Sequence, residues 1–129
     1  MRFTVLVGVA LVAGCADETI SGYANREATY RLEEMHGAPV EWPATIRFPE
    51  RGRVVGQGPC NDFSAAQSLV YPWIEVAQPN ATRRMCPDMA AEQGYLEALQ
   101  AAHLVEVSGP VLILTDDTGR EMVFRAQSH

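Results

Sequence analysis

Short segments of alternating apolar and polar residues, separated by turn residues, constrain the fold of this 129-residue chain more than any other feature. Residues 111–115 and 121–125 flank an Asp-Asp-Thr-Gly sequence that is typical of a hairpin turn. A second hairpin is predicted around Glu50-Arg51-Gly52, between residues 45–48 and 53–56. Four further segments bring the prediction to about seven or eight short strands; they are residues 29–35, 62–70, 73–76 and 104–108.

One stretch, residues 87–102, is rich in helix-forming residues and interrupts the strand pattern. Met89, Leu96 and Leu99 share one stripe of this predicted helix, and Glu92 lies on the same stripe. Strands followed by one late helix predict an α+β fold. The expected architecture is a mostly antiparallel curled sheet or partly open barrel, with the helix packed across it.

Composition places the chain among ordinary single-domain proteins, with 47% apolar and 20% charged residues. All ten basic residues are arginines, and the absence of lysine excludes Schiff-base catalysis and a Walker-type phosphate loop. A net charge of −6 argues against nucleic acid as a partner. The three histidines are scattered along the sequence, so no cofactor or metal site is predicted.

The first residues are expected to direct export. Arg2 precedes an apolar run over residues 3–13, which as a helix would span about 16 Å, roughly half the hydrocarbon core of a bilayer. Such a run is typical of a signal peptide. The sequence Leu-Val-Ala-Gly before Cys15 resembles the lipobox of bacterial lipoproteins, which implies cleavage after Gly14 and a lipid on Cys15. The alternatives are a secretory signal with an unrelated cysteine, or a buried N-terminal strand.

These expectations divide the chain into three parts. Residues 1–14 would be a lipoprotein signal peptide, residues 15–27 a flexible lipid-anchored tether, and residues 28–129 the folded domain. The membrane contact would be made through the lipid on Cys15, with the domain facing the periplasm. Because Ala16 rather than aspartate follows the cysteine, resemblance to enterobacterial sorting favours the outer over the inner membrane.

If Cys15 carries lipid, one pair of cysteines remains, Cys60 and Cys86, with 25 residues between them. An oxidising periplasm favours a disulfide between them. The chain-entropy model gives that bond about 3 kcal/mol of stabilisation. Two free buried thiols are the first alternative, and a metal or catalytic role is the second, although neither cysteine has the C-x-x-C spacing.

The central segment carries a family resemblance. Residues 56–63 read Gly-Gln-Gly-Pro-Cys-Asn-Asp-Phe, residues 81–87 read Ala-Thr-Arg-Arg-Met-Cys-Pro, and the apolar run 111–114 follows later. Together they resemble the META domain, or HslJ-like, family of bacterial envelope proteins, except that Pro59 stands where glycine is common. The resemblance implies an antiparallel, partly closed barrel interrupted by a helix. It also implies a single-domain lipoprotein without an established enzymatic reaction, linked in some bacteria to stress tolerance.

Four residues of this segment are expected to have structural roles. Asn61 follows the glycine turn and is expected to bond to nearby backbone rather than to a ligand. Glu92 needs a partner if it is buried, and Arg83 or Arg84, just before the helix, would supply an ion pair. A solvated glutamate and a catalytic acid are the alternatives for Glu92.

Three functions remain open. The first is a non-enzymatic envelope protein that acts through contacts with a protein partner. The second is a carrier or sensor that holds a small apolar ligand, such as an acyl chain, in the barrel mouth. The third is an enzyme or a protease inhibitor, which would require a pocket of converging polar groups.

Overall fold

A computed structural model describes residues 2–4 and 16–127. The predicted signal peptide lies mostly outside these residues, and Cys15 lies outside them. No helix in the described ranges is long and apolar enough to cross a membrane. The elements are the 3-10 helix η1 (Ile20–Gly22), the helix α1 (Met89–Ala101) and the strands β1 (Tyr30–Met35), β2 (Ala38–Pro39), β3 (Thr45–Glu50), β4 (Gly52–Gln57), β5 (Asp62–Gln67), β6 (Ala77–Ala81), β7 (Ala102–Ser108), β8 (Val111–Asp116) and β9 (Glu121–Ala126).

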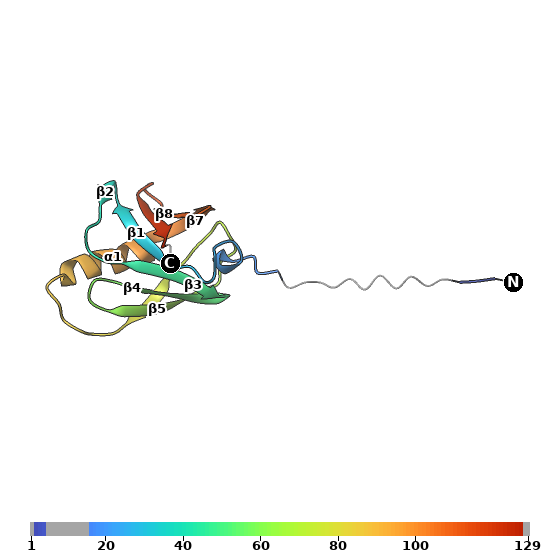
Figure 1. The fold of residues 1–129 in the computed structure, drawn as a ribbon, viewed down its shortest axis with the longest axis horizontal. Helices are drawn as coiled ribbons and strands as arrows, with labels where there is room; N and C mark the ends of the chain where they lie inside the picture. Colours follow the sequence, from blue (N-terminus) through green and yellow to red (C-terminus); the bar gives the residue numbers. More distant parts are fainter. Residues whose placement is uncertain (1, 5–15, 128–129) are drawn as a thin grey trace.

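The strands form one antiparallel sheet in the order β6-β5-β4-β3-β1-β9-β8-β7, and the short β2 pairs with β1. The sheet curls into a half-barrel, with β3, β4 and β5 on one side and β7 and β8 on the other (Figure 1). The predicted α+β fold, with one helix packed on a curled antiparallel sheet, is confirmed. Both predicted hairpins form, as β3–β4 and β8–β9.

The segment between β5 and β6 covers the free edge of β7. The Val105 amide donates to the Pro72 carbonyl over 2.8 Å, and the Ile74 amide donates to the His103 carbonyl over 2.9 Å. The strand predicted over residues 73–76 is therefore wrong, because these residues make a single bridge to β7 before the regular strand β6 begins. Its apolar pattern reflects Ile74 and Val76, which are buried in the core.

The concave side of the sheet is filled by aromatic side chains gathered around Tyr95 of α1. The Tyr95 ring centroid lies 6.0 Å from that of Phe63, 6.4 Å from that of Phe124 and 6.1 Å from that of Trp42. Its hydroxyl donates to the Thr45 carbonyl over 2.7 Å. Burial raises the pKa of Tyr95 well above its usual value.

The buried face of α1 differs from the predicted stripe. Leu99 is buried as expected, but Met89 and Leu96 are partly exposed. Tyr95 and Ala98 take their place in the core. The buried face is therefore centred on Tyr95 and Leu99, and Leu96 packs at its margin.

The flexible tether expected over residues 15–27 is contradicted for residues 17–27, which belong to the folded domain. Ile20 is only 2% exposed and packs in the core, and Thr19 forms a β-bridge with Val70. Asp17 accepts hydrogen bonds from Thr19 and Ser21 and pairs with Arg26 at 3.0 Å. Burial tends to raise the pKa of Asp17, but these hydrogen bonds and Arg26 outweigh it and lower the pKa.

Candidate functional site

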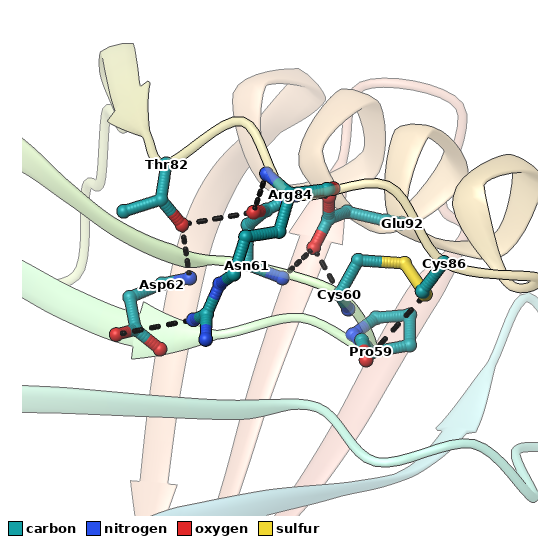
Figure 2. Close-up of a disulfide and its surroundings, with 8 residues drawn as sticks. All are labelled: Pro59, Cys60, Asn61, Asp62, Thr82, Arg84, Cys86 and Glu92. Carbon is teal, nitrogen blue, oxygen red and sulfur yellow. Dashed lines mark hydrogen bonds and ion pairs between the residues drawn. A yellow bond between two sulfur atoms is a disulfide. The ribbon is translucent and has the colours of Figure 1, made fainter.

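The disulfide predicted between Cys60 and Cys86 is present, with 5.6 Å between the two Cα atoms. Cys60 lies in the loop that enters β5, and Cys86 lies just before α1 (Figure 2). The bond therefore joins the sheet to the start of the helix. Four polar residues gather beside it, and with Cys60 they form what we call the Asn61–Glu92 cluster: Cys60, Asn61, Thr82, Arg84 and Glu92.

Asn61 is buried and uses both ends of its amide. Its Oδ1 accepts from the Arg84 backbone N–H over 2.6 Å and from the Thr82 hydroxyl over 2.9 Å. Its Nδ2 donates to the Arg84 carbonyl over 2.9 Å and to Glu92 Oε2 over 2.6 Å. Asn61 thus bonds to backbone as expected, but that backbone lies in the loop after β6 rather than in its own turn. Thr82, a residue of the 81–87 motif for which no role was predicted, completes the set.

Glu92 points from α1 toward the loop that carries Cys60 and Asn61 (Figure 2) and is 3% exposed. Its Oε1 accepts from the backbone amides of Cys60, over 3.1 Å, and Asn61, over 2.5 Å. Its Oε2 accepts from the Asn61 side chain. These charge-assisted bonds satisfy a buried carboxylate without a cation.

The ion pair predicted between Glu92 and Arg83 or Arg84 is wrong. Arg84 Nη2 instead lies 3.9 Å from Asp62 Oδ2, and both of those side chains are more than half exposed. Arg83 is also exposed. The loop contacts Asn61 through its backbone, and the guanidinium groups of Arg83 and Arg84 stay exposed to water. Burying these charges in the core would cost desolvation free energy.

Comparison with known families gives a match to the META domain over residues 24–129. The chain belongs to the META domain family. Comparison with curated proteins finds no match. This META domain is, however, similar in fold to three solved structures, each less than 25% identical to it.

One of these is a crystal structure of a DUF4847 family protein from Bacteroides vulgatus ATCC 8482, with 14% identity and a TM-score of 0.62. The alignment covers 81% of the META chain and 95% of that protein. An NMR structure of a protein from Burkholderia xenovorans shares 18% identity, with a TM-score of 0.59 and coverage of 79% and 81%. A further NMR structure shares 23% identity, with a TM-score of 0.61 and coverage of 78% and 89%. At these identities the likeness shows the fold.

Two glycines of the META motif allow close approaches that larger residues would block. A Cβ atom on Gly58 would lie 2.7 Å from Glu92 Oε1, inside the space that the carboxylate needs. A Cβ atom on Gly56 would lie 2.2 Å from the Thr45 carbonyl oxygen, where β3 and β4 pair. The sequence showed a glycine turn here, and the structure gives its reason: Gly58 lets the loop approach the helix, and Gly56 lets β4 approach β3.

Two surface grooves border the cluster in this META domain. One, of about 650 Å³, lies on the outer face of β3 to β6 and contains Arg47, Arg53 and Asp62. The other, of about 360 Å³, lies between the loop after β6 and α1 and contains Met85, Met89 and Leu96. Within the ranges that the structure describes, no group of three or more histidine, cysteine or acidic side chains could hold a metal ion.

Proposed function

We propose that this META-domain chain is a small lipid-anchored protein of the bacterial envelope. Its lipid would lie in the outer rather than the inner membrane, and its domain would face the periplasm. We propose further that it is not an enzyme and that it supports envelope maintenance or stress tolerance by binding another protein. The apolar run before Cys15 and the lipobox-like sequence support the anchor. The disulfide supports an oxidising compartment.

The arrangement of the Asn61–Glu92 cluster supports a structural role for the motif residues. A general acid needs access to a reacting group, whereas Glu92 is 3% exposed and both its oxygens already accept hydrogen bonds. Removing it would therefore be expected to loosen the attachment of α1 rather than to stop a reaction.

One observation carries the proposal of protein contact. Met85 is 83% exposed beside the groove that contains the partly exposed Met89 and Leu96. Exposed methionines adapt their shape to varied partners, and apolar side chains around a groove mark interaction sites. An apolar ligand inside the half-barrel, by contrast, would need the space that Tyr95, Phe63 and Phe124 fill.

Site-specific photo-crosslinking in living cells tests this proposal. A photo-crosslinking amino acid at Met85 is expected to give a discrete protein adduct. The same amino acid at Glu97, exposed on α1 but outside the groove, is the matched control and is expected to give none. No adduct from Met85, or equal adducts from both positions, would contradict protein contact at the groove. A lipid-sized adduct would favour the carrier instead.

A further inference from the structure

A cluster of exposed apolar side chains lies where the N-terminal segment joins the half-barrel. Tyr23, Val70 and Trp73 are 54%, 51% and 55% exposed, unusually high values for apolar residues of this size. Leu69 and Leu104 are partly exposed beside them. We call this set the apolar rim: Tyr23, Leu69, Val70, Trp73 and Leu104.

The fold brings the rim residues together from three distant segments. The Tyr23 ring stacks on that of Tyr71, with centroids 4.0 Å apart. Trp73 forms a β-bridge with Leu104. The rim is therefore a fixed surface of the domain, held by ring stacking and backbone pairing.

The rim lies beside the point where the chain leaves for its proposed anchor. The Tyr71 amide donates to the Glu18 carbonyl over 2.8 Å, and Thr19 bridges to Val70. Glu18 is three residues after Cys15, and an extended chain covers at most about 3.5 Å per residue, or about 10 Å here. A lipid on Cys15 would thus hold Glu18 within about 10 Å of the membrane surface, and Val70 of the rim bridges the next residue, Thr19.

The side chains of the rim suit that position. Tryptophan and tyrosine are enriched at the boundary between membrane and water, where the ring lies among apolar groups and the polar edge remains wet. The exposed carboxylates nearby are Glu18 and Glu75, and the neighbouring Arg26 is paired with Asp17, so the surroundings favour a zwitterionic lipid surface over an anionic one.

We propose that the apolar rim docks on the phospholipid bilayer that holds the Cys15 lipid, so that the domain rests on the membrane with Trp73 among the headgroups. This inference depends on the lipid anchor of the proposed function. It predicts that the end of the half-barrel carrying the rim faces the bilayer, while the end carrying Trp42 faces away.

The two tryptophans give a matched pair of probes. Trp42 lies just before the first residue of β3. Most of the rim lies just after β5, and the last residue of β5 pairs with the first residue of β4. That residue of β4 comes shortly after the last residue of β3. A six-residue strand spans about 20 Å, so the loop that carries the rim leaves β5 at the end opposite the one where Trp42 enters β3. Figure 1 shows residues 16–27 entering on the side away from the β1–β2 turn and the start of α1.

The lipidated chain is reconstituted in phosphatidylcholine vesicles that carry brominated acyl chains. In a Trp42→Phe chain the remaining Trp73 emission is expected to shift to the blue and to be quenched severalfold. In a Trp73→Phe chain the Trp42 emission is expected to change little. Equal emission of Trp73 in the vesicles and in an unlipidated Cys15→Ser chain in buffer would overturn docking.

A charge in the rim provides a second measurement. Val70→Asp in the Trp73-only chain is expected to abolish most of the quenching, while Ala38→Asp, exposed in β2 at the β1–β2 turn, leaves it intact. Unchanged quenching in the Val70→Asp chain would contradict docking through the rim. Mass spectrometry separates the two proposals, since lipid on Cys15 without quenching overturns docking alone, and absence of the lipid overturns the anchor and docking together.

Discussion

The substitution Glu92→Ala tests the role of the Asn61–Glu92 cluster most sharply. It leaves the backbone amides of Cys60 and Asn61 and the side-chain amide of Asn61 without the acceptor that now satisfies them. Each buried donor left without a partner costs about 1–3 kcal/mol. Water can reach Cys60, which is partly exposed, and alanine favours the helix slightly. We therefore expect a net loss of about 4 kcal/mol in the free energy of unfolding.

Denaturant unfolding followed by circular dichroism measures this loss. For a domain of this size it corresponds to a fall in melting temperature of about 15 °C. Glu97→Ala, on the exposed face of the same helix, is the control and should change the free energy by less than about 0.5 kcal/mol. If Glu92→Ala unfolds at the same denaturant concentration as Glu97→Ala, the carboxylate does not stabilise the domain and the reasoning fails.

Three further predictions concern the disulfide, an acidic turn and two glycines. Replacing Cys60 and Cys86 together by serine should cost about 3 kcal/mol of unfolding free energy, and adding a reductant to the parent should reproduce the loss in denaturant melts. The Asp116 carboxylate accepts hydrogen bonds from Thr118, which have the largest effect, and from Arg120. Together they outweigh the effect of burial and lower the pKa of Asp116. Its contribution is thus complete above the pKa of the unfolded chain and is lost as pH falls below about 4. Asp116→Asn should flatten the acid side of the stability profile. Gly56→Ala should prevent correct folding, because the new Cβ would collide with backbone, whereas Gly94→Ala meets no atom within 4 Å and should stabilise α1 by about 1 kcal/mol.

Each of these has a clear contrary outcome. An unchanged denaturant melt of the parent after its disulfide has been fully reduced would show that the disulfide contributes nothing to stability. An unchanged acid limb in Asp116→Asn would mean that other carboxylates control the acid response. A soluble Gly56→Ala chain with the stability of the parent would contradict the close approach of β3 and β4 at that position.

Local patterns predicted the local elements well. The hairpin of β8 and β9 was predicted because its strands alternate and its turn residues stand at the tip, and it forms with Val111 opposite Arg125. The helix predicted over residues 87–102 forms as Met89–Ala101. Such elements depend on contacts between near neighbours, which sequence patterns record.

Long-range contacts account for the errors. Residues 17–27 look like a tether because they are polar, yet the burial of Ile20 and the bridge from Thr19 to Val70 attach this segment to the domain. The partners of Glu92 could not be predicted because two of the three are backbone amides, which leave no mark in the sequence, and the third is the side chain of Asn61, 31 positions away. The two glycines beside that loop were the available signal, since glycine permits close approach.

Intact mass spectrometry of protein from the membrane fraction examines export, lipidation at Cys15 and oxidation of Cys60 and Cys86 in one experiment. We expect a chain that begins at Cys15, carries acyl groups and shows no thiol that reacts before reduction. An uncut chain with three reactive thiols would contradict the export, the anchor and the disulfide in one measurement.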